Sequence, residues 1–497
     1  MPQLGEEAPV TAEKAGQPLA HNSPTLAADP TEPRFVALAS RVDNPDFSCM
    51  LHLSGDRGRS WVPSTPLPKL PAGADKCYAP EVAFDRNGLL YFMFVGLSGL
   101  GNHPTGVFLA TSADRGRTFS APRNVLGPRV YMPRMALDPE YGRQGRIHLV
   151  WVHARAAPTT GGFPPTDNPI LAAHSDDGGR SFSKPVRVSD KSRRRAVAPA
   201  PAVGRSGSIH VAYYDLGDDA RDYEGLEGPA WDGTWSLIVA TSADRGASFG
   251  RGAVVDGGLI PPERIMVIFT TPPPALVADG KARLWAGWWD ARNGDWDVFV
   301  RRSLDGGRSW GPTLRVNDDR RGNGRHQYLP QLAIAPGGRL DAIFYDRRSD
   351  DENLRNHVSY ASWHDGARGF SSNRRLTSEA SDSRIGPTFE SLASSAGLYE
   401  LGGRLGLLAR RDGAVAAWAD TRNGEVGFIR QDVVTASVSL PRQRNGSGWE
   451  RIVLPALLCV LFFGGGWVRA RVRRGRAQRH VRFALTGFPA ERLPERE

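Results

Sequence analysis

The sequence predicts an all-β protein, a β-propeller of six or seven blades with seven favoured, followed by one C-terminal transmembrane helix. Three observations predict it: a turn motif repeated at nearly constant spacing, a proline motif in phase with it, and an apolar stretch that precedes an arginine-rich tail. Glycine and proline, 56 and 38 of 497 residues, make up about 19% of the chain. The usual share is about 12%, so the composition favours turns over long helices.

The turn motif has the pattern S-x-D-x-G-x-[ST]-[FW] and occurs five times. Its aspartates are Asp56, Asp114, Asp177, Asp244 and Asp305, and a degraded sixth copy keeps Asp365. Successive aspartates lie 58, 63, 67, 61 and 60 residues apart. Aspartate and serine side chains bond backbone N–H groups nearby and close tight turns, and glycine permits the positive φ that such turns need. We therefore expect each motif, called a box below, to clasp a hairpin and to have a structural role.

The second repeat is a proline followed by a short apolar strand. Its seven prolines are Pro24, Pro80, Pro133, Pro199, Pro274, Pro330 and Pro387. A third segment, alternating or apolar, lies between the two motifs, so each unit contains about four strands. Units of this length and strand content are typical of propeller blades. The sequence thus predicts a propeller over residues 20–435.

The seventh unit has no box, so its outer strand must come from elsewhere in the chain. Residues 1–19 form an N-terminal segment that we expect to supply this strand and close the ring, which would protect the sheet edges.

A membrane anchor is predicted after the propeller. Residues 436–451 form a linker, and residues 452–468 contain no charge, which suits a transmembrane helix. The tail, residues 469–497, is rich in arginine, and the positive-inside rule places it in the cytoplasm and the propeller outside the cell. A buried C-terminal helix is the alternative. The first 24 residues lack the features of a signal peptide, so we expect a truncated start, with reversed topology as the other possibility.

The cysteines, the charge distribution and the absence of certain motifs limit the possible structures and functions of the protein. Cys49 and Cys77 are the only cysteines outside the predicted span, which motivates the hypothesis of a disulfide, with two buried free cysteines as the alternative. The net charge of +10 is concentrated in the tail, so nucleic acid is not expected as a partner. The chain has no P-loop, GxGxxG, HExxH or GxSxG motif, which removes support for nucleotide and serine-hydrolase functions.

Five boxes on four-stranded repeats, over about residues 20–435, resemble the Asp-box (BNR) repeats of the sialidase superfamily. The resemblance implies a glycan ligand and sialidase chemistry: three arginines hold the substrate carboxylate, a tyrosine paired with a glutamate is the nucleophile, and an aspartate is the acid/base. The family's first arginine belongs to an [FY]-R-I-P motif, but the matching stretch here is His21-Asn22-Ser23-Pro24. Two functions follow: an exo-α-sialidase, or a non-catalytic propeller that binds a glycan or a protein.

Candidate site residues surround the repeated prolines, because inner strands of a propeller face its channel. Tyr328 and Glu390 are the expected nucleophile and activator, with Glu81 as the other acid. The expected substrate-binding residues are Arg134, Arg325, Arg384, His326, Tyr78 and Tyr131. Arg384 lies in Ser-Arg-Ile-Gly-Pro, which is the nearest match to the family's arginine motif.

A D-x-R triplet recurs in three successive units. Its pairs are Asp290 with Arg292, Asp346 with Arg348, and Asp420 with Arg422. The triplets form either a ring of charged groups at one face or, as the structural alternative, turns in which the aspartate caps the turn and pairs with its own arginine.

No cofactor is expected, with one exception. The acidic insert at residues 216–235 contains Asp218, Asp219 and Asp222, whose oxygen atoms suit calcium. The alternative is an acidic, solvated loop.

Overall fold

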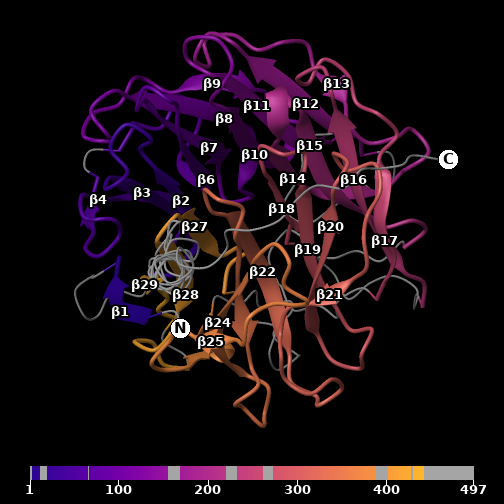
Figure 1. Cartoon of the computed structure of the whole chain (residues 1–497). Coiled ribbons are helices and arrows are strands. Elements are labelled where there is room, and N and C mark those ends of the chain that lie inside the picture. Colours follow the sequence, from indigo (N-terminus) through magenta and orange to yellow (C-terminus); the bar gives the residue numbers. More distant parts are fainter. Residues whose placement is uncertain are drawn as a thin grey trace, which may run out of the picture. The chain divides into compact units, whose positions relative to one another are not determined.

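In the computed structural model, seven antiparallel sheets follow one another around a ring, and the first strand of each sheet lies toward the centre (Figure 1). The structure describes residues 3–11, 19–64, 67–154, 168–219, 232–260, 272–386, 401–426 and 429–440. These residues belong to a first unit that ends at Leu440, whereas the second unit, residues 441–497, lies outside the described residues. The predicted all-β propeller is confirmed, and it has seven blades.

The blades take their strands in chain order, from the centre outward. Blade one contains β2 (His21–Ala28), β3 (Val36–Val42), β4 (Ser48–Ser54) and β5 (Val62–Pro63). Blade two contains β6 (Lys76–Phe84), β7 (Leu90–Ser98), β8 (His103–Ser112) and β9 (Arg123–Leu126). Blade three contains β10 (Val130–Asp138), β11 (Arg146–His153), β12 (Ile170–Ser175) and β13 (Val186–Arg187). Blade four contains β14 (Ala196–Val203), β15 (Ile209–Asp215), β16 (Trp235–Ser242) and β17 (Ala253–Leu259).

The remaining blades follow the same order until the last. Blade five contains β18 (Ala275–Ala278), β19 (Leu284–Asp290), β20 (Asp297–Ser303) and β21 (Leu314–Arg315). Blade six contains β22 (Gln327–Ile334), β23 (Leu340–Asp346), β24 (Arg355–Trp363) and β25 (Arg374–Arg375), and β26 (Ser381–Asp382) also pairs with β24. Blade seven contains β27 (Gly406–Arg410), β28 (Gly413–Asp420), β29 (Asp432–Ser439) and β1 (Gln3–Pro9).

The N-terminal strand β1 is the outer strand of blade seven. It pairs antiparallel with β29, and Glu7 lies opposite Ala436. Strands from the beginning and the end of the described chain therefore meet in one sheet, where β1 covers the edge of β29 and closes the ring.

Each box closes the turn between the third and fourth strands of its blade. In the second box, Ser112 Oγ accepts a hydrogen bond from Gly116 N at 2.7 Å and donates one to Asp114 Oδ1 at 2.7 Å. Asp114 also accepts bonds from the backbone N–H of Thr118 and from its hydroxyl. These bonds, led by the Thr118 hydroxyl, lower the pKa of Asp114 to about 2. The glycine has φ +90°, which explains why the motif requires glycine there.

The D-x-R triplets form structural pairs, as their structural alternative predicted. In each triplet, the aspartate accepts a hydrogen bond from the backbone N–H of its arginine. It also forms an ion pair with the guanidinium group of that arginine. Each arginine then reaches a second carboxylate: Asp256 for Arg292, Asp318 for Arg348 and Glu7 for Arg422. The triplets thus link neighbouring strands and blades.

Five inner strands share one irregularity at the repeated proline. On β6, Tyr78 pairs with Val95 and Glu81 pairs with Met93, so three steps on one strand face two on the other. The same bulge occurs on β2, β10, β14 and β22. The residue before the proline has a positive φ in each: Ser23, Ala79, Met132, Ala198 and Leu329. Such a bulge re-aims side chains, so Tyr78 and Glu81 share a face although they are three positions apart.

The predicted disulfide is confirmed. Cys49 on β4 is bonded to Cys77 on β6, with 5.5 Å between their Cα atoms, and this bond joins blades one and two.

The predicted membrane span, residues 452–468, lies outside the described residues. Within the ranges that the structure describes, no helix has the length and apolar character needed to cross a membrane.

Candidate functional site

A pocket of about 140 Å³ opens between blades one, two, three and four. The pocket lies at the end of the blades opposite the boxes. This follows from the strand order, because successive strands of a blade run in opposite directions. Connections between first and second strands, and between third and fourth, share the box face; the remaining connections share the other face, called the pocket face here. Arg41 at the end of β3 and Asn102 between β7 and β8 both line the pocket, so it belongs to the pocket face.

The bulges of the inner strands build the floor of this pocket. Ser23, Ala79, Met132 and Ala198 are the bulged residues of four successive blades, and all four line it. The backbone N–H of Ala198 donates to Met132 Sδ at 3.3 Å, which ties blade four to blade three. The repeated proline motif therefore shapes the pocket.

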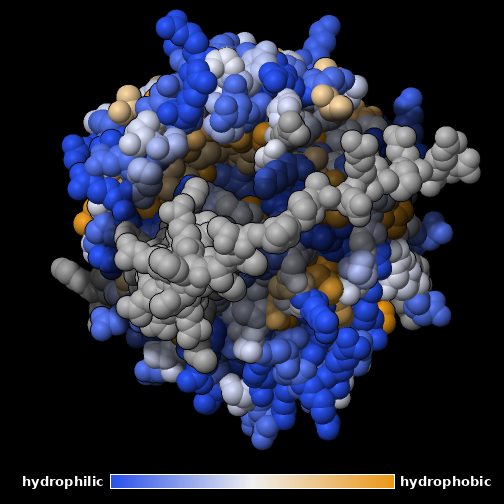
Figure 2. All heavy atoms as spheres, viewed as in Figure 1, coloured by the Kyte–Doolittle hydropathy of each residue, from blue (hydrophilic) through white to orange (hydrophobic). Residues whose placement is uncertain are grey.

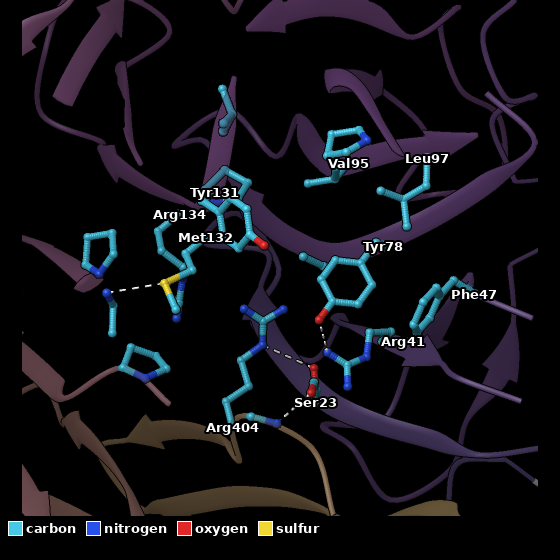
Figure 3. Close-up of a pocket in the computed structure, with 18 of the residues that line it drawn as sticks. Ser23, Arg41, Phe47, Tyr78, Val95, Leu97, Tyr131, Met132, Arg134 and Arg404 are labelled. Carbon is cyan, nitrogen blue, oxygen red and sulfur yellow. Dashed lines mark hydrogen bonds between the residues drawn. The ribbon is translucent and has the colours of Figure 1, made fainter. Parts of the chain in front are cut away.

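Three arginines from different elements line the pocket, and Figure 3 shows their side chains around it. Arg41 comes from the second strand of blade one, Arg134 from the inner strand of blade three, and Arg404 from the segment that leads into β27. Blades far apart in the sequence thus contribute one guanidinium each.

Glu81 holds two of these arginines. Its Oε1 lies 2.5 Å from Arg134 Nε and accepts a hydrogen bond from Arg404 Nη1 at 2.8 Å. Its Oε2 accepts a bond from Met135 N at 2.6 Å. Glu81 is 5% exposed, so it acts as a buried counter-charge behind the arginines.

Arg404 is fixed on all sides. Besides the bond to Glu81, its Nη2 donates to Pro80 O at 2.6 Å and its Nε to Ser23 O at 3.2 Å. Burial, followed by the charge of Arg134, lowers the pKa of Arg404 to about 10, even though Glu81 opposes the shift. Arg41 adds to the lowering, so two neighbouring guanidinium groups act on Arg404 besides its burial.

Arg41 is fixed by Asp43 and touches the tyrosine of blade two. Arg41 Nη2 donates to Asp43 Oδ2 at 2.7 Å, and its Nη1 donates to the Tyr78 hydroxyl at 2.8 Å. The guanidinium carbon also lies 4.7 Å from the centre of the Tyr78 ring. Phe47 packs edge-on against Tyr78, with 5.1 Å between the ring centres.

In the described part of the chain, the guanidinium group of Arg134 contacts a protein carboxylate through Nε alone. Its Nε is paired with Glu81, whereas the described residues provide no hydrogen bond to its two terminal nitrogens. The side chain is 25% exposed. The fork of Arg134 is therefore positioned by Glu81 and available to a ligand.

Apolar side chains form the rest of the wall. They are Phe47, Val95, Leu97, Pro104, Val130, Pro133, Pro199 and Pro273. Among the described residues that line the pocket, none is an aspartate or a glutamate. In the surface view, hydrophilic residues cover the periphery, and hydrophobic ones show toward the centre of the ring (Figure 2). The pocket thus combines a cationic side with an apolar wall.

Four of the predicted site residues meet at this pocket. Tyr78, Tyr131 and Arg134 line it, and Glu81 lies directly behind Arg134. They come from blades two and three, whose inner strands carry the same bulge.

Tyr328 lies outside the pocket lining. It occupies the same position before the bulge as Tyr78, but it is 2% exposed and packs against Trp296 and Tyr345. Its hydroxyl donates to Asn356 Oδ1 at 2.7 Å, and burial raises its pKa. The structure places Tyr328 in the packing of blade six, a placement that does not match the nucleophile role predicted for it. Its predicted partner, Glu390, lies outside the described residues.

The other predicted binding residues are engaged elsewhere in blade six. Arg325 bonds the carbonyls of Asp350 and Asp351, and His326 stacks on Trp296 with 3.9 Å between ring centres. Arg384 pairs with Asp382 two residues before it. None of the three lines the pocket between blades one and four.

The acidic insert is described only in part. Asp218 is exposed, and Asp222 lies outside the described residues. Asp219 is buried and accepts a hydrogen bond from Trp235 Nε1 at 2.9 Å. Within the described ranges, no group of three or more histidine, cysteine, aspartate or glutamate residues is placed to hold a metal ion.

Sequence reasoning missed Arg41 and Arg404. Arg41 pairs with the residue before the bulge, and the corresponding residues of other blades are Val95, Val152, Tyr214 and Tyr345. The charge of Arg41, at a strand position that is apolar or aromatic in the other blades, was the sequence signal that could have identified it as a site residue. Arg404 precedes an inner strand that has no proline bulge, so no repeat pointed to it.

Comparisons with known proteins give distant structural similarity. No protein-family model matches the chain, and no curated protein matches it. Among solved structures, it is similar to a protein of unknown function from Dyadobacter fermentans, with 11% identity, a TM-score of 0.46, and coverage of 88% of this chain and 99% of that one. It is similar to an alpha-L-arabinanase from Penicillium chrysogenum solved with arabinobiose, with 11% identity, a TM-score of 0.44, and coverage of 87% and 98%. It is also similar to a Hadza microbial sialidase, with 13% identity, a TM-score of 0.41, and coverage of 81% and 73%.

Proposed function

We propose that the protein is a glycan-directed propeller whose pocket binds an acidic sugar by its carboxylate. The observation that carries the proposal is the meeting of Arg41, Arg134 and Arg404 at one pocket whose described lining contains no carboxylate. An anionic ligand would offset the repulsion that Arg134 and Arg41 exert on Arg404.

Arg134 is the residue proposed to grip the carboxylate. A guanidinium fork and a carboxylate match in geometry and form two parallel hydrogen bonds. Glu81 fixes Nε of Arg134, which leaves both terminal nitrogens for the ligand. Every side-chain nitrogen of Arg404 and Arg41 already has a protein partner, so these two arginines contribute mainly positive charge.

The rest of the sugar would rest on the aromatic and apolar wall. Tyr78 and Tyr131 present ring faces and hydroxyls, which suit a ring with apolar C–H edges and polar substituents. Asn102 supplies an amide at the rim.

A screen of immobilised glycans tests the proposal with Arg134→Lys beside the parent protein. Lysine keeps the charge but loses the bidentate fork, so binding to acidic glycans should weaken by about 10- to 100-fold. Arg143→Lys, an exposed change on the box face of the same blade, is the matched control and should bind as the parent does. Equal binding of acidic and neutral glycans by the parent would refute the proposal.

Hydrolysis of a sialoside is the second candidate function, and Tyr78 favours it. This tyrosine lies in the pocket with its hydroxyl on Arg41, where the resemblance to sialidases calls for a nucleophile beside the arginines. Recognition without chemistry ranks first because Glu81 is committed to two arginines and a backbone N–H, and so is not placed to serve as a base.

A fluorogenic sialoside separates the two candidates. Turnover by the parent that falls at least 100-fold in Tyr78→Phe, while sialoside binding persists, would establish hydrolysis. Binding without turnover would leave recognition as the function.

We further propose that residues 452–468 anchor the propeller to a membrane, with the propeller outside the cell. The charge pattern of the sequence and the Cys49–Cys77 disulfide, a bond typical of oxidising compartments, support this location. Cell fractionation and protease treatment of intact cells test it. Recovery of the protein in the soluble fraction would count against the anchor.

A further inference from the structure

A second cavity lies at the seam between blades seven and one. It measures about 400 Å³ and is lined by Arg57 and Arg59 from the first box, Arg410 and Asp412 from a turn of blade seven, and Glu6 from β1. The described lining also includes Ser437 to Ser439 at the end of β29, Glu7 and Ala8 of β1, and three glycines. The cavity lies on the box face, away from the sugar pocket, because it is built from a box turn and a turn between first and second strands.

Three guanidinium groups face this cavity with little compensation. Arg57 pairs with Asp412 at 3.6 Å, and both side chains are more than half exposed. Arg410 donates to Arg57 O at 3.1 Å, but its buried Nε has no hydrogen-bond acceptor. No carboxylate of the described residues lies within ion-pair distance of Arg410 or Arg59. Burial, together with the nearby Arg57 and Arg59, lowers the pKa of Arg410, although Asp412 opposes the shift.

Other seams of the ring have the carboxylate that this seam lacks. In blade three, Arg146 donates to the backbone carbonyl of Arg245 at 2.8 Å, which is the counterpart of the bond from Arg410 to Arg57. Arg146 is then held by both oxygens of Asp176, at 2.6 and 2.8 Å. The arginines beside the corresponding turns of blades five and six also have carboxylate partners: Asp279 and Asp365 for Arg283, and Asp341 for Arg339.

The missing carboxylate follows from the missing seventh box. Asp176 belongs to the box of blade three, the same blade as Arg146, whereas Asp365 belongs to the degraded box of blade six and reaches Arg283 of the preceding blade. In blade seven the third strand, β29, and the fourth, β1, come from opposite ends of the described chain, so no box turn joins them. The cavity lies beside the end of β29 and the beginning of β1, where that turn would be.

We propose that this cavity binds a tetrahedral oxyanion, phosphate or sulfate, between Arg57, Arg59 and Arg410. The ion would replace the box carboxylate that blade seven lacks. Of the three guanidinium groups, only that of Arg57 has a carboxylate partner among the described residues, Asp412 at 3.6 Å, so two positive charges remain for a divalent anion. Guanidinium groups also form paired hydrogen bonds with phosphate oxygens. The lining contains three acidic residues: Glu6 and Asp412 are exposed, and Glu7 is already paired with Arg422.

Bound phosphate would connect both ends of the propeller. It would touch the box turn of blade one and the turn of blade seven, next to the strand β1 that closes the ring. Ligands that bind only the folded state raise the melting temperature, so phosphate should stabilise the closed ring.

Thermal unfolding of the full chain, in inorganic phosphate or in chloride at equal ionic strength and pH 7, tests the site. The parent should melt several degrees higher in phosphate, with half of the shift reached at millimolar concentration. Phosphate also stabilises proteins without binding, so variants define the specific part. Arg410→Gln should lose most of the shift. Arg180→Gln, at the box position equivalent to Arg59 but in blade three, should keep it.

A gain-of-function variant keeps the proposal falsifiable. Ser439→Asp places a carboxylate in the lining and should raise the melting temperature in chloride while reducing the phosphate shift. An equal shift in parent, Arg410→Gln and Ser439→Asp would overturn the site. Arg134→Gln reports any phosphate that binds in the sugar pocket, so failure at the seam and failure of the sugar proposal are distinguishable.

The same assay separates two sources of phosphate. Inorganic phosphate and water-soluble dihexanoyl phosphatidic acid are compared at equal concentration. A larger Arg410-dependent shift with the lipid would assign the site to a lipid headgroup, and a larger shift with the inorganic ion would assign it to the free anion.

Discussion

Arg41 and Tyr78 meet across the seam between blades one and two, where a guanidinium nitrogen donates to the tyrosine hydroxyl at 2.8 Å. The Cys49–Cys77 disulfide lies next to this pair, because Arg41 is opposite Cys49 in the sheet register and Cys77 directly precedes Tyr78. One covalent bond thus fixes the spacing of two pocket residues that belong to different blades.

Removal of the disulfide should therefore affect both stability and binding. Cys49→Ala with Cys77→Ala opens a link across 28 residues, and the chain-entropy model gives a loss of about 3–4 kcal/mol in the free energy of unfolding. Denaturant unfolding measures this loss, and calorimetry measures the affinity for an acidic sugar. Leu53→Ala, in the same blade, controls for a general loss of stability. Weaker binding in both variants would show that the bridge has no particular role at the pocket.

Glu81 should be essential as a buried counter-charge. Glu81→Gln leaves Arg404 and Arg134 with the same shape around them but without a negative charge, so we expect a loss of about 3 kcal/mol in the free energy of unfolding. Urea unfolding measures it. Glu140→Gln, an exposed change in blade three, should lie within about 0.5 kcal/mol of the parent. Similar values for the two variants would contradict the role of Glu81.

Buried histidines should make the propeller acid-sensitive. Burial lowers the pKa of His148 to about 3 and that of His210 to about 4. An unfolded histidine has a pKa near 6.5 and takes up a proton below that pH, whereas both buried histidines are still neutral in the folded protein. The unfolded state then binds more protons, and each histidine lowers the free energy of unfolding by about 1.4 kcal/mol per pH unit between pH 6.5 and its folded pKa.

Unfolding curves between pH 7 and 4 check this prediction. His148→Gln should flatten the pH dependence, whereas the change of exposed His364 to Gln should leave it as steep as in the parent. An unchanged slope in His148→Gln would remove this histidine from the explanation.

The closure of the ring depends on Glu7. It pairs with Arg422 at 2.7 Å and accepts hydrogen bonds from Ser378 N and Oγ, both at 2.8 Å, so β1 is tied to blades six and seven. Glu7→Gln should lower the free energy of unfolding by about 1–3 kcal/mol. Its neighbour Glu6 is exposed, and Glu6→Gln should have little effect. Thermal unfolding distinguishes them, and equal melting temperatures would contradict a role for Glu7 in closure.

The sequence predicts the propeller well because its repeats are physical devices. The boxes need serine, aspartate and glycine to close their turns, and those residues recur at the spacing of one blade. Five of the seven prolines mark inner strands for a similar reason, since each follows a bulged residue of positive φ. Pro274 directly precedes β18, and Pro387 lies outside the described residues.

The site was harder to predict because it is formed by departures from the repeat. The bulge shifts the register by one residue, which places Tyr78 and Glu81 on one face against the usual alternation. Arg41 comes from a second strand, and Arg404 from a segment without the proline motif. Tyr78 and Tyr328 occupy equivalent positions, but Trp296 and Tyr345 pack against Tyr328, and no feature of its own unit reveals that.

The central claim is that Arg134 holds a sugar carboxylate, and one comparison tests it most directly. Isothermal titration of the parent protein with N-acetylneuraminic acid and with its methyl ester compares ligands that differ only at the carboxyl group, which is charged in the acid and neutral in the ester. The account predicts binding of the acid that is at least 10-fold tighter than binding of the ester, and loss of that difference in Arg134→Lys. Equal affinity for acid and ester, or a difference that survives in Arg134→Lys, would contradict it.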